Sequence, residues 1–240
     1  MLIDLNCDMG EIPYSWNNGR DKELLKYLTS VNISCGAHAG TPELIKATID
    51  EALKLYLNIG AHPSFPDRKN FGRLAIAMDI GVLRNSLQNQ IAWLKNEVED
   101  IGGKLHHIKP HGALYNLAAK NEEISRVICE VLLEEDSKLI LFCPPNSVLS
   151  KLALDLDIKI WRESFLDRQY HRDGSLVSRK EPNAVFGNIE MALKQFQCLG
   201  LQKVLTREGD YIPLISETVC IHGDNVAALD IAKALNFRNN

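Results

Sequence analysis

Short apolar segments alternate with longer amphipathic segments along most of this chain. The short segments are typical of strands, and the longer ones repeat their apolar residues every three or four positions, the spacing of one helical face. The clearest helix pattern runs from Leu83 to Ile101, and Gly102 and Gly103 predict its end. Seven strands are predicted, at residues 2–7, 31–35, 57–61, 104–108, 138–142, 158–161 and 218–221.

Polar residues suited to N-caps predict where four of the helices begin. Thr41 is followed by proline, a combination that is favoured at a helix N-terminus. Asn121 and Asn225 precede two further segments with helical spacing, and either Asn146 or Ser147 precedes another.

Two segments fall outside the alternation of strands and helices. Residues 163–184 are polar with little periodicity, and residues 204–215 resemble a small β excursion before the last strand. No linker rich in Pro, Gly or Ser and no change of composition divides the chain. We therefore expect one domain that spans residues 1–240.

Regular alternation of strands and helices predicts a parallel sheet, because parallel strands need crossover connections. Central strands of an open sheet are continuously apolar, whereas several strands here place polar residues on one face. These residues are Asp4, Asn6 and Asp8; Asn32 and Ser34; and His107, Lys109 and His111. Polar interiors favour an α/β fold closed into a seven-stranded βα barrel over a doubly wound open sheet.

Composition and charge exclude several classes of protein. Hydrophobic residues make up 45% of the chain and charged residues 24%, which excludes gross disorder. The formal net charge is −4 and there is no long basic run, so we expect no nucleic-acid partner. The mean hydropathy is −0.13, and no apolar stretch approaches the roughly 20 residues of a membrane span.

The first residues and the cysteines predict the compartment. Acidic residues stand where a signal peptide needs basic ones, so we expect a soluble cytoplasmic protein. The six cysteines include no C-x-x-C pair, and we expect them to be reduced core thiols.

Polar residues follow nearly every predicted strand at its carboxyl end, where βα barrels carry their functional groups. The candidates are Asn6, Asp8 and Glu11; His38; His62; Lys109 and His111; Glu163, Asp167 and Arg168; and His222 and Asp224. Histidines serve as metal ligands or as general acids and bases near neutral pH. Lys109 and Arg168 are suited to binding a carboxylate or phosphate and to stabilising an oxyanion. The set predicts hydrolytic or ligase-like chemistry at a polar carbonyl group.

Other polar residues are interpreted as structural. We assign structural roles to His106, His171, Ser34 and Ser64, and we expect Asp4 to hydrogen-bond backbone at the base of the barrel. Asp167 and Arg168 also allow a simpler interpretation, as an ion pair within a loop. His107 and His111 do not form a helical zinc pair, because a proline lies between them. The glycine-rich nucleotide motifs and the nucleophile elbow are absent from the sequence.

Seven sequence strings at these same positions resemble the LamB/YcsF family, whose members form the A subunit of prokaryotic 5-oxoprolinase. The strings are DLNCDMGE (4–11), NISCGAHAG (32–40), GAHPSFPD (60–67), KPHGALYN (109–116), ESFLDRQY (163–170), SLVSR (175–179) and CIHGDN (220–225). The resemblance runs from residue 2 to about residue 235. Two positions depart from the usual pattern, since Thr41 stands where relatives more often have Asp and Leu74 where they usually have Arg.

The resemblance implies a fold and an activity. The fold is a seven-stranded βα barrel like that of some glycoside hydrolases and polysaccharide deacetylases. The activity is the opening of 5-oxo-L-proline to L-glutamate with ATP as co-substrate, together with two further subunits, B and C. Because no nucleotide motif is present, the ATP site lies either here or on a partner subunit, and the partner is favoured.

Within that activity, we assign roles to the candidate residues as hypotheses. Asp8 or Glu11 is the candidate base and His62 or His111 the candidate acid, and Lys109 together with Arg168 binds the anion. The residues expected to bind substrate are Asn6, His38, Glu163, Arg168, His222 and Asp224.

Two alternative functions remain open. The first is a metal-dependent deacetylase- or amidase-like hydrolase, in which Asp8, His38, His62 and also His222 converge on a divalent ion. The second is a non-catalytic subunit that only binds the lactam and leaves all covalent chemistry to its partners.

Overall fold

Seven parallel strands close into a barrel in the computed structural model, which describes residues 3–179 and 181–235. The strands pair in the order β1-β2-β3-β4-β5-β6-β9, and β9 pairs with β1 to close the sheet. They are β1 (Asp4–Met9), β2 (Ser30–Ser34), β3 (Asn58–His62), β4 (Leu105–Ile108), β5 (Ile140–Cys143), β6 (Ile160–Phe165) and β9 (Thr218–Cys220). The predicted seven-stranded βα barrel is therefore confirmed.

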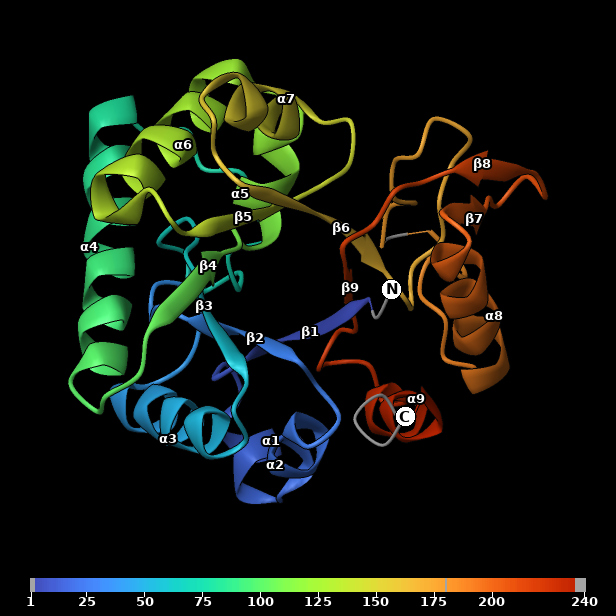
Figure 1. Ribbon diagram of the computed structural model, residues 1–240, viewed down its shortest axis with the longest axis horizontal. Helices are drawn as coiled ribbons and strands as arrows, with labels where there is room; N and C mark the ends of the chain where they lie inside the picture. The colour runs from blue at the N-terminus through green and yellow to red at the C-terminus, as the bar shows by residue number, and fades with distance from the viewer. Residues whose placement is uncertain (1–2, 180, 236–240) are drawn as a thin grey trace.

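Helices surround the barrel sheet (Figure 1). Their buried apolar faces belong to one continuous core with the outward faces of the strands. The helices are α1 (Pro13–Asn17), α2 (Arg20–Leu25), α3 (Pro42–Lys54), α4 (Ile80–Glu99), α5 (Gly112–Ala118), α6 (Glu122–Asp136), α7 (Val148–Asp155), α8 (Ile189–Gly200) and α9 (Ala228–Leu235). None of the helices that the structure describes is long and apolar enough to cross a membrane.

Helix α4 shows how the apolar period becomes buried surface. Asp79 caps its first turn by accepting from two backbone N–H groups. Gly102, with φ of +80°, lies in the turn that follows the helix. Ile101 is 51% exposed beyond the helix end at Glu99, so the predicted pattern was two residues too long. The buried apolar residues of α4 are Leu83, Leu87, Ile91, Leu94 and Val98.

Three of the four predicted N-caps are confirmed. The side chains of Thr41, Asn121 and Ser147 each accept a hydrogen bond from the first turn of their helix. Asn225 does not directly precede its helix, because α9 begins three residues later, at Ala228, although Asn225 Oδ1 accepts from the backbone N–H of Ala227 in the turn before it. The Asn225 side chain also ties the preceding turn to the loop after β6.

Two strands end two or more residues beyond their predicted ends. Strand β6 extends through Glu163 to Phe165, into the segment predicted as irregular. These polar residues were not predicted as part of a strand because they resemble the residues of a loop. The polar interior of the barrel nevertheless buries them. Strand β1 ends at Met9 rather than at residue 7, and the first residue predicted for it lies outside the described residues.

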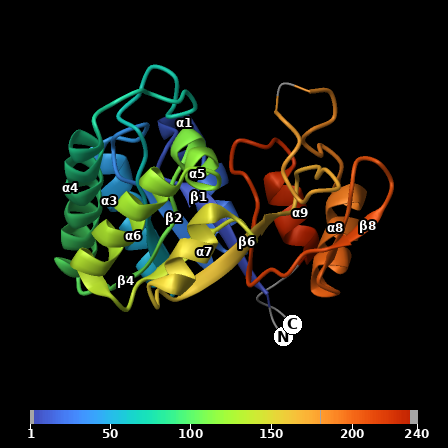
Figure 2. The same cartoon turned by 90° about the horizontal axis from the view of Figure 1, so that it is seen from above.

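The chain makes a long excursion between β6 and β9. Residues 166–188, where the structure describes them, form turns and isolated bridges. Helix α8 follows, and then the antiparallel hairpin of β7 (Lys203–Leu205) and β8 (Tyr211–Pro213). The helix and hairpin lie to one side of the barrel in both views (Figures 1 and 2). The predicted β excursion at residues 204–215 is confirmed.

The lower interior of the barrel is filled by polar groups that satisfy one another. Asp4 accepts from the hydroxyls of Thr29, Ser30 and Thr218 at 2.5–2.6 Å, not from backbone as predicted.

All six cysteines are free and buried, which confirms the expectation of core thiols.

Candidate functional site

The candidate site lies at the carboxyl end of the barrel strands, where the loops that follow β1 to β4 begin. Asp8 is inside β1 and Glu11 follows it. His38 is in the loop after β2 and His62 is the last residue of β3. Lys109 and His111 follow β4 directly.

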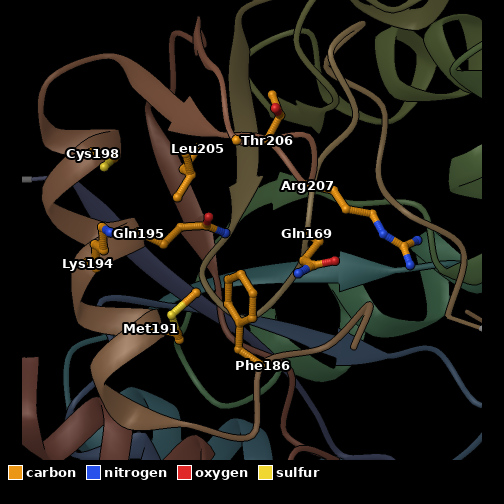
Figure 3. A pocket seen from close by; sticks show the side chains of 10 residues that line it. Gln169, Phe186, Met191, Lys194, Gln195, Cys198, Leu205, Thr206 and Arg207 are labelled. Carbon is orange, nitrogen blue, oxygen red and sulfur yellow. The ribbon is translucent and has the colours of Figure 1, made fainter. Parts of the chain in front are cut away.

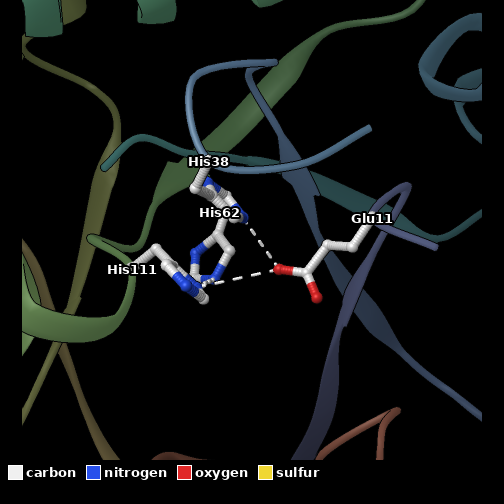
Figure 4. A group of neighbouring side chains, drawn as sticks. All are labelled: Glu11, His38, His62 and His111. Atoms are coloured by element: carbon white, nitrogen blue, oxygen red, sulfur yellow. Dashed lines mark hydrogen bonds and ion pairs between the residues drawn. The ribbon is translucent and has the colours of Figure 1, made fainter. Parts of the chain in front are cut away.

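Four of these side chains converge into what we call the histidine cluster, made of Glu11, His38, His62 and His111 (Figure 4). Glu11 Oε1 lies 2.9 Å from His38 Nε2 and 3.7 Å from His111 Nδ1. His111 Nδ1 lies 2.9 Å from His62 Nε2. One ligand atom from each of the four residues lies within 4.8 Å of all the others, so the cluster could hold a metal ion.

Burial sets the charges of the cluster. It lowers the pKa of His38 well below the ordinary value and lowers that of His111 to about 2. Burial, together with the nearby Asp8, raises the pKa of Glu11 to about 8. In the absence of a bound cation, these imidazoles favour their neutral forms, which are the forms that bind metals.

The structure brings only some of the metal ligands predicted from sequence into the histidine cluster. His38 and His62 belong to the cluster, whereas Asp8 and His222 do not. Asp8 Oδ2 lies 3.3 Å from His62 Nε2, but Asp8 Oδ1 binds Lys109 at 2.8 Å. His222 follows β9 and belongs to a separate ion pair. Spacing along the sequence could not show these partners.

Lys109 forms a second charged group beside the histidine cluster. Its ammonium lies 2.8 Å from Asp8 Oδ1 and 2.8 Å from Glu163 Oε1, and its side chain is only 3% exposed. Cys220 Sγ lies 3.2 Å from the same nitrogen. Burial lowers the pKa of Lys109, but the carboxylates of Asp8 and Glu163 outweigh burial and raise that pKa well above its ordinary value. Lys109 is therefore charged at neutral pH.

Asp8 joins the two groups. Burial raises its pKa, but His62 and the Lys109 ammonium outweigh burial and hold the pKa well below the ordinary range. The Asp8 side chain keeps 14% of its surface exposed, which is more than either neighbour has. An ionised, accessible carboxylate thus lies between the cluster and the buried cation.

A layer of amides below Lys109 holds this arrangement. Asn6 Oδ1 accepts from Asn32 Nδ2 at 2.7 Å, and Asn32 also donates to Asp8 Oδ1 at 2.9 Å. His107 Nε2 donates to Asn32 Oδ1 at 2.8 Å. Asn6 is fully buried and lies 3.4 Å from the Lys109 ammonium, so it contacts the cation from below.

The strands on the other side of the mouth, β6 and β9, contribute a different set. Asp167 Oδ1 accepts from His222 Nδ1 at 2.7 Å and Asp167 Oδ2 from Asn225 Nδ2 at 2.9 Å. The alternative of an Asp167–Arg168 ion pair is therefore wrong. Arg168 instead donates through Nη2 to Val177 O at 2.6 Å. Arg168 Nε is buried without a hydrogen-bond partner among the described residues.

Asp224 closes the rim above this set. It accepts from Arg73 at 2.7 Å and from Arg179 at 3.3 Å, so it links the loops after β3, β6 and β9. The two histidines interpreted as structural lie apart from the site: His106 Nδ1 contacts the His107 ring, and His171 pairs with an exposed glutamate.

Sequence reasoning missed Cys220 and the role of Ser64. Cys220 stands opposite Asn6 in the β1–β9 register, so strand alternation places it on the polar inner face. Ser64 Oγ lies 3.0 Å from His38 Nδ1, and its backbone N–H and carbonyl are both held by Gln90. No local sequence signal distinguishes such a supporting serine from an ordinary loop residue.

Two cavities are not lined by these charged side chains. One of about 230 Å³ lies within the excursion, between α8 and the segments before and after it, where Phe186 and Met191 line it beside Gln195 (Figure 3). Gln195 Nε2 donates to the carbonyl oxygen of Phe165, the last residue of β6, and to that of Arg168 in the loop that follows, so it acts structurally. The other, of about 400 Å³, lies between α3 and α4 beside Arg68 and Trp93.

Comparisons with known proteins agree over nearly the whole chain. The model of the LamB/YcsF family matches residues 3–239. The sequence is 39% identical over 234 residues to the 5-oxoprolinase A subunit of Bacillus cytotoxicus, covering 97% of this protein and 93% of that one. It is 38% identical to the 5-oxoprolinase A subunit of Bordetella pertussis, with the same coverage. The crystal structure of a lactam utilization protein from Thermus thermophilus superposes with a TM-score of 0.90 at 32% identity, covering 98% and 95% of the two chains.

Proposed function

This protein belongs to the LamB/YcsF family, and on that premise we propose that it is the A subunit of a 5-oxoprolinase. The observation that carries the proposal is the similarity of 39% identity over 97% of the chain to a protein of that name. The reaction is the opening of 5-oxo-L-proline to L-glutamate, coupled to the hydrolysis of ATP.

The chemistry explains why ATP is needed. An unstrained five-membered lactam resists hydrolysis, and transfer of a phosphoryl group to the amide oxygen activates the ring carbon. Water then attacks that carbon and loses a proton to a base, while the ring nitrogen gains a proton and leaves. The resulting acyl phosphate is hydrolysed to glutamate and phosphate. The enzyme therefore needs a base, an acid and a cation that stabilises negative oxygen.

We assign the base role to Asp8 and the cation role to Lys109. Asp8 is supported over Glu11 because it is ionised and accessible, whereas the pKa of Glu11 is raised to about 8. His62 and His111 lie beside Asp8 and are the candidate acids. Lys109 is charged and buried, so its field acts in a water-poor site.

Residues on β6 and β9 are assigned to the substrate. The unpartnered Nε of Arg168 supports a role in binding an anion, such as the substrate carboxylate. His222 is held by Asp167 and keeps part of its side chain exposed, and Asp224 lies at the rim. Asn6 and Glu163 are buried against Lys109, so we assign them to holding that cation rather than to direct substrate contact.

ATP binding and partner dependence are further parts of the proposal. The sequence contains no phosphate-cradling loop, which supports phosphorylation on the B and C subunits. A released acyl phosphate would hydrolyse or recyclise, so the two half-sites should adjoin.

The test is glutamate formation from 5-oxoproline and ATP by this protein by itself, by B and C together, and by all three. We expect turnover only with all three. Asp8→Asn and Lys109→Ala, checked for folding by circular dichroism, should abolish it in the full complex. Lys151→Ala is the matched control, because Lys151 is exposed on α7. Full turnover by the isolated protein would overturn partner dependence, and wild-type turnover by both site variants would overturn the assigned roles.

The same assay separates two other functions. The histidine cluster favours a metal-dependent amidase as the second candidate, and that enzyme would open amides without ATP. A protein that only binds the lactam would leave B and C fully active on their own.

A further inference from the structure

We propose that the histidine cluster is a binding site for a divalent transition-metal ion of the zinc class. All of its ligands come from this one protein, so the site does not rest on the lactam reaction proposed above. Its four ligand atoms are His38 Nε2, His62 Nε2, His111 Nδ1 and Glu11 Oε1.

The donor–acceptor direction of two hydrogen bonds supports the inference. His62 Nδ1 lies 2.7 Å from the carbonyl oxygen of Lys109, and His111 Nε2 lies 2.9 Å from that of Phe71. A carbonyl oxygen only accepts, so these nitrogens carry the N–H of each neutral ring. His62 Nε2 and His111 Nδ1 therefore present lone pairs to each other at 2.9 Å. Two facing lone pairs repel unless a cation or proton joins them.

His38 likewise carries its proton on the nitrogen that points away from the cluster. Its Nδ1 lies 3.0 Å from Ser64 Oγ, and the Ser64 hydroxyl donates its only proton to the carbonyl oxygen of Phe65 at 2.8 Å. Ser64 Oγ therefore accepts from His38 Nδ1, which leaves His38 Nε2 as a lone pair. That lone pair lies 2.9 Å from Glu11 Oε1, another acceptor when the carboxyl group is ionised.

One shared proton cannot satisfy both acceptor pairs. Each pair needs a proton of its own, and the three rings are almost fully buried, with His38 and His62 1% exposed and His111 6% exposed. A divalent ion satisfies all four atoms at once. Its charge is balanced by Glu11 and by Asp8, whose Oδ2 lies 3.3 Å from His62 Nε2.

The spacing and the outer hydrogen bonds fit such an ion. Ligand atoms about 2.1 Å from a tetrahedral metal lie about 3.4 Å apart. The distances from Glu11 to His38 and His111 are 2.9 and 3.7 Å, and all four atoms lie within 4.8 Å of one another, so a small movement of the side chains would place them around one ion. Each histidine is oriented through its other nitrogen, which is the usual arrangement of metal-binding histidines. Three imidazoles favour zinc and its neighbours over magnesium or calcium, which prefer oxygen ligands.

The first experiment is titration of the chelator-treated full-length protein with Zn²⁺ by calorimetry, and with Co²⁺ by visible absorption. We expect one equivalent of each ion, and a Co²⁺ spectrum of low coordination number. Elemental analysis of the protein purified without chelator gives an independent stoichiometry. Failure of the isolated protein to bind either ion stoichiometrically would overturn the site, whatever the outcome of the glutamate assay.

Variants identify the ligands. His111→Gln and Glu11→Gln should abolish stoichiometric binding, whereas the matched control His171→Gln should leave it unchanged. Asp8→Asn and His222→Gln should also keep one equivalent, which separates this ligand set from one that includes those two residues. Loss of binding in His222→Gln, or full binding in His111→Gln, would overturn the assignment.

Two measurements remain informative where a ligand variant fails to fold. Ser64→Ala removes only the outer partner of His38, and we expect the Zn²⁺ affinity to fall by about 10–100-fold with the stoichiometry unchanged. Nitrogen-15 NMR of the metal-free protein should show N–H at Nδ1 of His38 and His62 and at Nε2 of His111. The opposite tautomers would contradict the proposal.

Discussion

The barrel mouth over β1 to β4 and the excursion between β6 and β9 are built in opposite ways. In the mouth, buried polar groups from separate strands bind one another, as Lys109 binds Asp8 and Glu163. In the excursion, ion pairs are exposed, as between Arg172 and Asp210. Leu201, 68% exposed, is one of its large apolar side chains that remain in solvent.

The difference shows where a barrel can hold chemistry. Charges in the mouth are fixed by strand register, which does not relax when one side chain changes. Charges in the excursion sit on turns and a short hairpin, where water screens them. Substitutions in the mouth should therefore cost much more stability than matched substitutions in the excursion.

The largest expected difference concerns charge removal. Lys109→Met leaves the buried carboxylates of Asp8 and Glu163 without their cation and should lower the free energy of unfolding by about 3–5 kcal/mol. Arg207→Met, which breaks an exposed pair with Glu181 in the excursion, should cost less than about 1 kcal/mol. Urea denaturation at pH 7 measures both, and equal losses would refute the comparison.

Adding Glu163→Gln to Lys109→Met provides a control, because it removes one of the two carboxylates that have lost their cation. We expect the double variant to recover part of the lost stability.

Glycine substitutions should differ in sign between the two regions. A Cβ at Gly60 would lie 2.1 Å from His107 Nε2, and the His107 ring is stacked on Phe142 at 3.9 Å. Gly60→Ala should therefore cost about 3 kcal/mol. Gly200, the last residue of α8, has nothing within 4 Å of the position that a Cβ would take, and Gly200→Ala should stabilise by up to about 1 kcal/mol. Thermal melts followed by circular dichroism test both.

The stability that Asp167 contributes should depend on pH, which tests the comparison where the two regions meet. Burial raises its pKa, but His222 and the hydrogen bonds from His222 and Asn225 outweigh burial and lower it. Its ionised form therefore stabilises the fold above the ordinary Asp pKa of about 3.9, and that stability is lost as the pH falls through the lowered value. Asp167→Asn should cost about 2 kcal/mol at pH 7. Denaturation from pH 7 down to pH 3 should show the difference from wild type shrinking.

Asp21 on α2 should show a smaller pH-dependent effect than Asp167, with the opposite sign. Burial raises its pKa to about 6, against the charge of Arg20. The folded state then holds a proton that the unfolded state releases, so stability falls as the pH rises from about 4 to 6. Asp21→Asn should stabilise by about 1–2 kcal/mol at pH 7, and the gain should vanish below about pH 4. The same gain at every pH would contradict this explanation.

The sequence by itself determined the secondary structure and the class of fold. Apolar periodicity located all seven barrel strands and helix α4, because the two periods of burial are local properties of the chain. Alternating polar positions such as Asn6 and Asp8 also indicated a closed barrel, since only an enclosed interior buries them on one face. Strand ends were less certain, because Glu163 inside β6 has the same polarity as a loop residue.

Only the tertiary structure decided which polar residues meet. His38, His62 and His111 follow three different strands, and their convergence depends on strand register and on the paths of the loops. Nothing local distinguishes His111, which joins the cluster, from His222, which binds Asp167. The physical reason is that period and propensity act over a few residues, whereas the distance between two imidazoles is set by the packing of the whole barrel.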